Sequence, residues 1–509
     1  MLFNSFEYLI FLPIVFLLYW FVFDYALSKC KHQLWLQNLF IVVASYIFYG
    51  WWDWRFLVLI AITSFCSWGS GLLIGRREGE ETKEKNTPYT PHLTQKPNFW
   101  PRFWLISNII LNLGILGVYK YYDFFAREFA QLFGIESDFL LLHLILPVGI
   151  SFYTFQALSY SIDVYRGHIQ PTKDIVAFTA FLSFFPQLVA GPIERATNLL
   201  PQFQRKRTFN YAQAVDGMRQ ILWGLFKKIV IADNCAVYVD QVWATYDTQS
   251  GSTLLLAAIL FTFQIYGDFS GYSDIAIGSA KLFGIQLMRN FNVPYFSRDI
   301  AEFWRRWHIS LTTWFRDYVY IPLGGSRPNI PEAIRLKGDK AIEARYTKWI
   351  AVRNTFVIFL LSGFWHGANW TFIVWGIYHA LLFVPLLLMG KNRRYVHQKI
   401  NASEWPRMLL TLVLVMMGWV LFRAPSIADA WGYVCGICSM SIWSIPSLIT
   451  DYLLWFTLLM IVLMIAVEWR GREQDTAPLP HNRWVYYAIV LLIYWFATDK
   501  TTEFIYFQF

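Results

Sequence analysis

Two histidines lie in aromatic-rich motifs of a chain that is otherwise strongly apolar. His308 is part of FWRRWHISLTTWFRDYVYIPLGGSR, residues 303–327, and His366 is part of SGFWHGANW, residues 362–370. Burial in apolar surroundings disfavours the charged imidazolium, so a buried histidine stays neutral near pH 7 and can accept a proton. The two motifs therefore indicate an active site that contains His308 and His366.

The composition predicts that these motifs belong to a membrane protein. Of the 509 residues, 56% are hydrophobic, 19% are aromatic and only 15% are charged, an apolar share above that of a typical soluble domain. Apolar runs long enough to cross a hydrocarbon core of about 30 Å recur along the chain, and backbone groups in lipid must be satisfied internally. We therefore predict an all-α, polytopic membrane protein that forms a single membrane domain over residues 1–509.

Charge and cysteine usage argue against other classes. The 43 Lys and Arg exceed the 34 Asp and Glu, but the excess lies in loops between apolar runs, where it reports membrane orientation and gives no support for nucleic-acid binding. The five cysteines specify neither a disulfide framework nor a metal cage, because the CGIC pair at residues 435–438 has no second pair beside it. No bound metal or cofactor is expected.

The apolar pattern predicts about 11 to 13 transmembrane and re-entrant segments. The expected spans are residues 6–23, 34–52, 56–74, 103–125, 139–165, 212–231, 254–283, 350–365, 371–388, 409–422, 452–467 and 485–496. Residues 175–190 have basic residues at both ends, which favours a re-entrant hairpin over a short full span. Residues 75–102 are expected to form a cytoplasmic loop, 284–348 a cytoplasmic or re-entrant segment, and 425–446 an irregular surface segment.

Three ionisable residues, Asp268, Asp274 and Lys281, lie within or near membrane depth, where charge is costly and often functional. One interpretation is architectural, with the two aspartates paired to arginines of the following segment. The other is an ion or substrate path in a non-catalytic transporter. Inverted repeats would favour a transporter, and none is visible in the sequence.

Several motifs together resemble the membrane-bound O-acyltransferase family, in the branch of the alginate O-acetylase membrane subunit and the teichoic-acid D-alanyl transferase. The motifs are LPVGISFYTFQ, FFPQLVAGPIER, YGDFSGYSDIAIG, FWRRWHISLTTWFRDYVYIPLGGSR, SGFWHGANWTFIVWGIYHA and the closing FIYFQF. This resemblance implies a ring of tilted helices around a thinned central funnel. It also implies that His366, in the WHG motif, is the catalytic histidine and that His308 occupies the second family position.

Transfer of an acyl group from a thioester to an alcohol requires removal of the hydroxyl proton and stabilisation of the oxyanion. We expect His366 to act as general base, unless it forms a covalent acyl intermediate as a nucleophile. For His308, three roles remain open, namely orienting the donor, donating to the oxyanion or sharing the proton. His379 is expected to pack within its helix, and His143 has no partner motif, so neither is a catalytic candidate.

A thioester donor such as acetyl-CoA carries phosphates, which arginines bind well. Arg305, Arg306 and Arg316 are candidates for this contact, and Trp365 and Asn369 are candidates for contact with substrate or donor. The alternative for the three arginines is that they reach towards lipid headgroups at the membrane interface.

The sequence and the resemblance predict a multi-pass O-acetyltransferase of a bacterial inner membrane. The predicted reaction moves acetyl from a cytoplasmic thioester, coenzyme A or a carrier protein, across the membrane for O-acetylation of an exported or cell-wall polysaccharide. Membrane lipid and a separate extracytoplasmic acetyltransferase are the expected partners. A D-alanyl or lipid O-acyltransferase is the alternative within the family.

Overall fold

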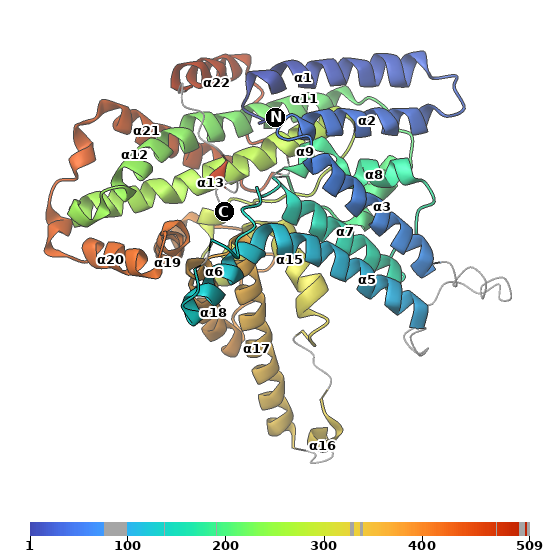
Figure 1. The fold of residues 1–509 in the computed structure, drawn as a ribbon. Coiled ribbons are helices and arrows are strands. Elements are labelled where there is room, and N and C mark those ends of the chain that lie inside the picture. The colour runs from blue at the N-terminus through green and yellow to red at the C-terminus, as the bar shows by residue number, and fades with distance from the viewer. Residues whose placement is uncertain are drawn as a thin grey trace. The chain divides into compact units, whose positions relative to one another are not determined.

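The computed structural model describes residues 1–75, 99–136, 138–189, 191–325, 330–335, 339–474, 476–497 and 504–505. Most of the expected cytoplasmic loop 75–102 lies outside these residues, as do 326–329 and 336–338 of the segment 284–348 and the end of the closing FIYFQF motif. The described residues form helices and connecting loops and include no strand, which confirms the all-α prediction (Figure 1).

The chain divides into two compact units. The first comprises Met1–Met218 and Ile275–Met288, and the second comprises Arg219–Asp274 and Arg289–Phe509. The first unit contains helices α1 (Phe6–Leu17), α2 (Gln33–Gly50), α3 (Phe56–Gly75), α5 (Phe99–Leu116), α6 (Tyr122–Phe133), α7 (Ile150–Tyr165), α8 (Ile175–Ser183), α9 (Phe185–Leu188), α10 (Ala196–Phe203) and most of α11 (Tyr211–Leu225).

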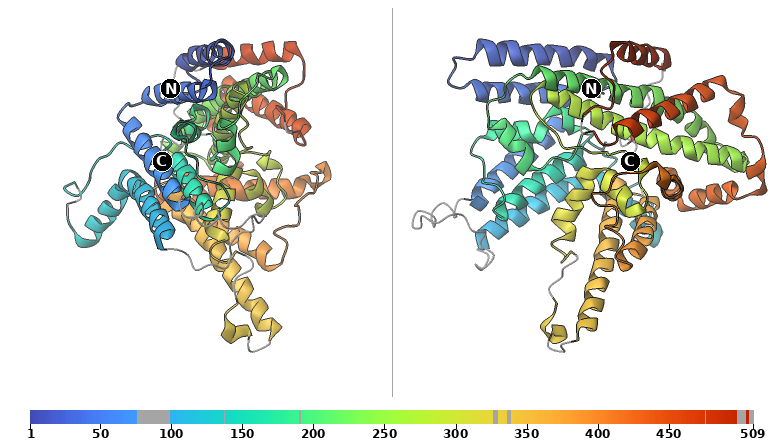
Figure 2. Two further views of the ribbon diagram at one scale, coloured as in Figure 1. Left: turned by 90° about the vertical axis from the view of Figure 1, so that its right-hand side faces the viewer. Right: turned by 180° about the vertical axis from the view of Figure 1, so that it is seen from behind.

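The second unit contains both histidine motifs. Its helices are α12 (Asp233–Trp243), the larger part of α13 (Gly251–Leu282), α14 (Ile300–Arg306), α15 (Ile309–Phe315), α16 (Glu332–Arg335), α17 (Lys340–His366), α18 (Trp370–Leu388), α19 (Trp405–Arg423), α20 (Ile427–Ile437), α21 (Tyr452–Gly471) and α22 (Arg483–Phe496). Figure 2 shows these elements from two further sides.

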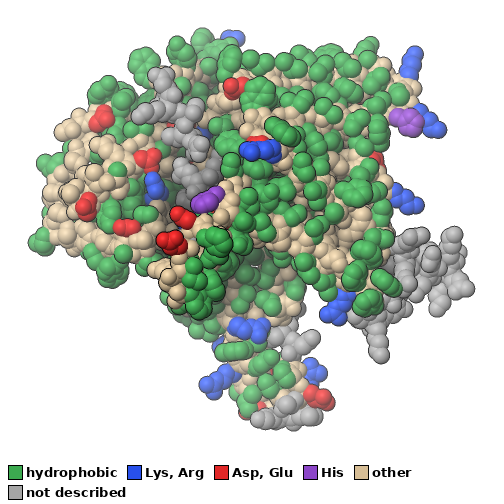
Figure 3. All heavy atoms as spheres, in the orientation of Figure 1, with side chains coloured by type: hydrophobic (Ala, Val, Ile, Leu, Met, Phe, Trp, Pro, Cys, Tyr) green, Lys and Arg blue, Asp and Glu red, His purple; other side chains and the backbone are tan. Residues whose placement is uncertain are grey.

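Among the described residues, seven helices are long and apolar enough to cross a membrane, or up to eight if one bent pair is counted as a span. The larger number expected from the sequence also includes shorter and re-entrant segments. Most of the exposed side chains on α1, among them Phe6, Leu9 and Ile14, are apolar, and Figure 3 shows hydrophobic side chains over this helix. Apolar residues that face outwards on a long helix are typical of lipid contact.

Polar and small residues bring membrane helices of the first unit together. Asn108 of α5 donates to Ser161 of α7 at 2.8 Å and accepts from Ser67 of α3 at 3.2 Å. Gly71 of α3 lies so close to Tyr160 of α7 that an added Cβ would be 2.5 Å from its ring. Such packing holds helices together where lipid removes the hydrophobic driving force.

Two predicted segments differ from the structure. The expected span 139–165 is helical only from Ile150, because Pro147 disfavours helix in the residue before it and Gly149 adopts a left-handed φ of 74°. An added Cβ at Gly149 would lie 2.3 Å from the carbonyl oxygen of Leu188, so the close backbone approach requires glycine. Residues 425–446, expected to be irregular, contain helix α20, whose first turn is capped by Ser426 accepting from the Asp429 amide.

Residues 175–190 contain two short helices, α8 and α9, with a break at Phe184. At about 1.5 Å per residue, neither helix is long enough to cross a hydrocarbon core. Residues 175–190 therefore do not form one continuous helix that spans the membrane. The break between α8 and α9 is consistent with the re-entrant interpretation.

Candidate active site

His308 lies between the short helices α14 and α15, where the chain turns sharply. Its backbone adopts a left-handed conformation with φ of 43°, which is uncommon for a residue other than glycine. The amide of Ile309 donates to the Asn290 carbonyl at 2.8 Å, and the amide of Thr312 donates to the His308 carbonyl at 3.0 Å. These bonds hold the turn, and they place the His308 side chain in the interior with 1% exposure.

The imidazole of His308 combines one polar edge with aromatic faces. Its Nδ1 lies 3.1 Å from Oδ1 of Asn290. The ring packs against Phe269 of α13 and Trp365 of α17, at centroid distances of 4.6 and 5.8 Å. Burial lowers the pKa of His308, which favours the neutral imidazole.

His366 is the last residue of α17 and is 3% exposed. Aromatic rings of three elements surround its imidazole at centroid distances of 5.0 to 5.2 Å, from Trp365, Trp375 of α18 and Phe422 of α19. The chain leaves the helix at Gly367 in an extended conformation, and an added Cβ at Gly367 would lie 2.2 Å from the ring of Phe372. The WHG sequence thus places the histidine at the helix end and leaves room for the adjoining helix.

Helices α17 and α18 approach each other closely through glycine. An added Cβ at Gly363 would lie 2.2 Å from the Phe372 carbonyl oxygen, and one at Gly376 would lie 2.3 Å from that of Phe359. The small residues let the two backbones meet, which brings Trp375 against His366. This crossing sets the position of His366.

Trp365 connects the two histidines. Its indole centroid is 5.8 Å from His308 and 5.0 Å from His366, so the imidazole centroids cannot be farther apart than the sum of these distances. The structure therefore brings together the two residues that the sequence singled out, with the side chain of a third candidate in contact with both.

His379 of α18 is a third buried histidine in this region. It is fully buried among Trp304, Trp375 and Phe359, and neither ring nitrogen has a hydrogen-bond partner among the described residues. Gly418 of α19 provides its space, since an added Cβ there would lie 2.7 Å from Nε2. The contacts agree with the packing role expected for His379.

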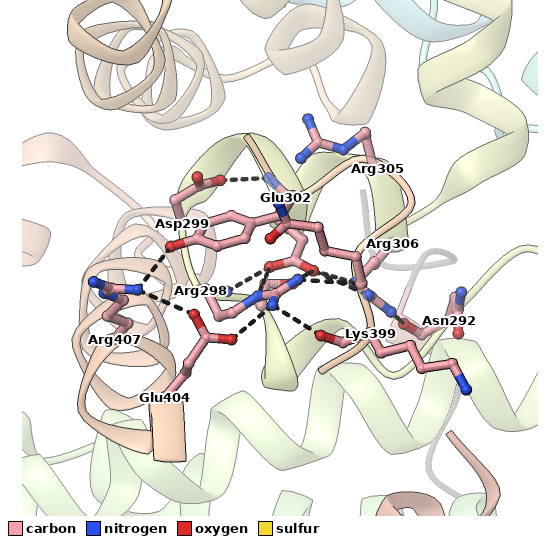
Figure 4. A network of polar contacts seen from close by, with 12 residues as sticks. Asn292, Arg298, Asp299, Glu302, Arg305, Arg306, Lys399, Glu404 and Arg407 are labelled. Atoms are coloured by element: carbon pink, nitrogen blue, oxygen red, sulfur yellow. Dashed lines mark hydrogen bonds and ion pairs between the residues drawn. The ribbon is translucent and has the colours of Figure 1, made fainter. Parts of the chain in front are cut away.

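The three candidate arginines have different environments. Arg306 donates to Glu302 at 3.0 Å and to the carbonyl of Asn292, and exposed Arg316 pairs with its neighbour Asp317 at 2.7 Å. Arg305 donates to the carbonyl of Asn392 at 2.6 Å, and in Figure 4 its guanidinium points away from Glu302. Among the described residues, Arg306 and Arg316 each bind a carboxylate, whereas Arg305 binds a backbone carbonyl.

Glu302 is the centre of a buried network that supports α14 (Figure 4). Arg298 binds it through Nε and Nη2 at 3.0 and 2.9 Å, and binds Glu404 at 2.7 Å. Arg298 also lies 4.0 Å from the ring centroid of Tyr395. Because α14 leads directly into His308, this network fixes the segment that carries the histidine.

Asn369, the remaining candidate, begins α18. Its side-chain oxygen accepts from the Thr371 amide at 3.1 Å, and its amide donates to the Pro425 carbonyl at 3.0 Å. These bonds give Asn369 a helix-capping role in the structure.

The intramembrane carboxylates pair with lysines. Asp268 lies 2.7 Å from Lys228, and Asp274 lies 2.6 Å from Lys227. The predicted pairing with arginines of the following segment is therefore wrong in its partner. Residues Phe226–Ala232 form a π-helical segment, and both of its lysines are buried. Lys281, in the first unit, pairs with Asp216 at 2.6 Å, so all three singled-out residues take part in ion pairs, as the architectural interpretation requires.

Asp268 also binds a residue near the end of the chain. Its Oδ2 accepts from the Ile505 amide at 2.7 Å, and the ring of Phe504 lies 4.4 Å from Tyr272 and 5.8 Å from Phe269. Since Phe269 also contacts His308, the beginning of the FIYFQF motif packs one side chain away from that histidine.

The described residues contain no group of three or more His, Cys, Asp or Glu side chains arranged to hold a metal ion. Sequence reasoning missed Asn290, which contacts His308, and Trp375 and Phe422, which contact His366. Asn290 lies in a loop without periodicity, between Arg289 and Phe291, so its sequence context carries no signal for this contact.

Comparison with known proteins links these motifs to acyl transfer. A family model described as "MBOAT, membrane-bound O-acyltransferase family" matches residues 168–332. The chain is 38% identical to the "Probable alginate O-acetylase AlgI" of Pseudomonas aeruginosa over 81% of its own length and 72% of that protein. It is 34% identical to the "Peptidoglycan O-acetyltransferase" of Helicobacter pylori over 85% and 78%, and 29% identical to the "Teichoic acid D-alanyltransferase" of Bacillus subtilis over 55% and 69%.

Proposed function

Because the chain belongs to the membrane-bound O-acyltransferase family and is a multi-pass membrane acyltransferase, we propose that it supplies acetyl groups for O-acetylation of an exported or cell-wall polysaccharide. The donor in this proposal is a cytoplasmic thioester, acetyl-CoA or an acyl carrier protein. The acetyl group crosses the membrane and passes to a separate extracytoplasmic acetyltransferase. We place the protein in a bacterial inner membrane.

The observation that carries the proposal is the pair of buried imidazoles joined by Trp365. In the proposed step, the attacking hydroxyl oxygen bonds to the thioester carbonyl carbon as a neutral imidazole removes the hydroxyl proton. The carbon–sulfur bond then breaks, and the thiolate takes the proton back. We assign the base to His366, with His308 orienting the donor, donating to the oxyanion or sharing the proton.

The arrangement of arginines supports a donor that bears phosphate. Arg305 is half-buried and donates a hydrogen bond to the carbonyl of Asn392, whereas Arg306 is bound to Glu302. A guanidinium has five N–H donors, and those that are not used for the carbonyl can bind a phosphate of coenzyme A or of a phosphopantetheine arm. Arg305 is therefore our first choice among the three arginines for donor contact.

The relatives also include a D-alanyltransferase, so a D-alanyl group is the second candidate for the transferred acyl. It ranks below acetyl because that relative is less similar and matches a smaller part of this chain than the two O-acetylating relatives do.

The test measures ester-linked acetyl in secreted and cell-wall polysaccharide of a deletion strain. The strain carries the intact gene, His366→Ala, or the control Gly114→Ala, whose added Cβ has no atom within 4 Å. Membrane levels of each protein are measured in parallel. We expect the intact gene and the control to restore acetyl ester and His366→Ala to reduce it by about 10² or more. Acetyl content that is independent of the gene would refute the substrate, and full restoration by His366→Ala would refute the mechanism.

A further inference from the structure

Asn290, in the loop between α13 and α14, binds the first turn of α15 with both its backbone and its side chain. Its carbonyl accepts from the Ile309 amide at 2.8 Å, and its Oδ1 accepts from the Ser310 amide at 3.3 Å and the Ser310 hydroxyl at 2.9 Å. At its other side, Nδ2 donates to the hydroxyl oxygen of Ser273 at 3.1 Å. A backbone N–H can only donate, so the oxygen of the Asn290 amide must face α15.

This orientation determines where His308 carries its proton. Nδ1 of His308 lies 3.1 Å from the same Oδ1, and a carbonyl oxygen offers only lone pairs. Two lone pairs at that distance repel, whereas an Nδ1–H makes a hydrogen bond. The neutral imidazole of His308 is therefore the Nδ1–H tautomer, and its Nε2 holds the lone pair.

The hydrogen bond between Nδ1 of His308 and Oδ1 of Asn290 is strengthened by its buried surroundings. Asn290, Ser310 and Ser273 are all buried, with exposed fractions of 2% or less. In such low-dielectric surroundings an amide–imidazole hydrogen bond is stronger than it would be in water, and the other tautomer would lose the bond from Nδ1–H to the Asn290 oxygen. The rings of Phe269 and Trp365 also restrict rotation of the imidazole.

We propose that Asn290 is a positioning residue for acyl transfer, which holds His308 in the Nδ1–H tautomer so that Nε2 acts as an acceptor. This inference rests on the proposed function and narrows it. Donation from Nε2 to the oxyanion requires an Nε2–H, which the neutral form lacks. His308 instead shares the hydroxyl proton, which moves to a ring lone pair as the carbon–oxygen bond forms and returns to the thiolate when the carbon–sulfur bond breaks.

The first test observes the tautomer itself and needs no substrate. Protein labelled with ¹⁵N-histidine is purified in detergent, and the His308 signals are identified by their loss in His308→Gln. We expect the Nδ1–H tautomer in the intact protein and in Ser310→Ala, which keeps the Asn290 oxygen. We expect Asn290→Ala to populate the Nε2–H tautomer. An Nε2–H tautomer in the intact protein, or an unchanged Nδ1–H tautomer in Asn290→Ala, would overturn the proposal.

The second test measures acetyl ester in the deletion strain. Asn290→Ala is expected to lower it by about 10² relative to the intact gene, at equal membrane level, because His308 would carry its proton on Nε2, the nitrogen that is to share the hydroxyl proton. Asn290→Asp retains an oxygen that accepts from Nδ1–H and is expected to recover part of the loss. A higher acetyl ester content with Asn290→Asp than with Asn290→Ala would support the positioning role of Asn290. An equal loss of acetyl ester in both variants would contradict it.

The two tests separate the inference from the proposed function. If Asn290→Ala does not fold, Ser273→Ala replaces it, since loss of that acceptor removes one restraint on the amide while the cap on α15 remains. Suppose that the Nδ1–H tautomer in the purified protein depends on Asn290 or Ser273, but that acetylation in the strain does not depend on the gene. The positioning role would then stand, and only the proposed substrate would be refuted. A tautomer that is independent of both residues would refute the positioning role even if acetylation is found.

Discussion

The indole of Trp365 meets the imidazole of His308 edge to face, with ring centroids 5.8 Å apart and ring planes at 64°. The next residue on the same helix is His366, whose ring is 5.0 Å from the same indole. Trp365 is therefore a packing element shared by the two candidate catalytic residues, which come from motifs well separated in the sequence.

Two replacements of Trp365 should distinguish its role in holding the two histidines from its contribution to protein stability. Trp365→Ala leaves a cavity beside both imidazoles and is expected to cost about 3 kcal/mol or more, with loss of acetylation. Trp365→Phe keeps an aromatic ring and is expected to retain a stable protein with reduced activity. Thermal unfolding in detergent and acetyl ester content provide the two measurements, and full activity of Trp365→Ala would show that the indole does not position the histidines.

The crossing of α17 and α18 is expected to depend on Gly376. In Gly376→Ala, the added Cβ would lie 2.3 Å from the Phe359 carbonyl oxygen, so the helix backbones must separate. We expect a cost of about 1–3 kcal/mol, measured as a lower unfolding temperature, and lower acetylation because His366 moves with the helix end. The matched control is Gly114→Ala, for which no atom lies within 4 Å of the new Cβ; an equal effect in both variants would contradict the crossing argument.

The Glu302 network predicts a dependence of stability on pH. Burial raises the pKa of Glu302, but hydrogen bonds from Arg298 and the charge of Arg306 outweigh it, so that the pKa lies below its usual value of 4.5. A lowered folded-state pKa contributes stability that is fully present above pH 4.5 and is lost as the pH falls further.

Glu302→Gln removes this contribution. At pH 7 it should destabilise the protein by about 3 kcal/mol, because it leaves buried arginines without their carboxylate. Unfolding temperatures of the intact protein and the variant should converge as the pH is lowered below 4.5. A difference that stays constant over this range would rule out the carboxylate charge as its source.

His379 offers a contrasting prediction. Both ring nitrogens are buried without a hydrogen-bond partner among the described residues, so an apolar side chain of similar size should remove a desolvation cost. We expect His379→Leu to unfold at the same temperature as the intact protein or higher, and to keep its acetylation. Lost acetylation in a protein of unchanged stability would instead assign His379 a part in the reaction.

The sequence predicted the class of the fold and the principal histidines because both are local properties. Apolar runs of sufficient length identify membrane helices without knowledge of their neighbours, and the WHG sequence around His366 contains its own helix end and the glycine that admits Phe372. The sequence was less successful where one residue changes the backbone. Gly149 adopts a left-handed φ, and within the predicted span 139–165 the helix begins only at Ile150.

The sequence by itself determined that this protein is an all-α membrane protein with His308 and His366 in apolar, aromatic surroundings. Only the tertiary structure decided which residues complete the site: Asn290 as the partner of His308, Trp365 in contact with both histidines, and lysines as the partners of Asp268 and Asp274. The physical reason is that these contacts join separate elements. They depend on how helices cross and where loops return, and the spacing of residues along one segment carries no information about either.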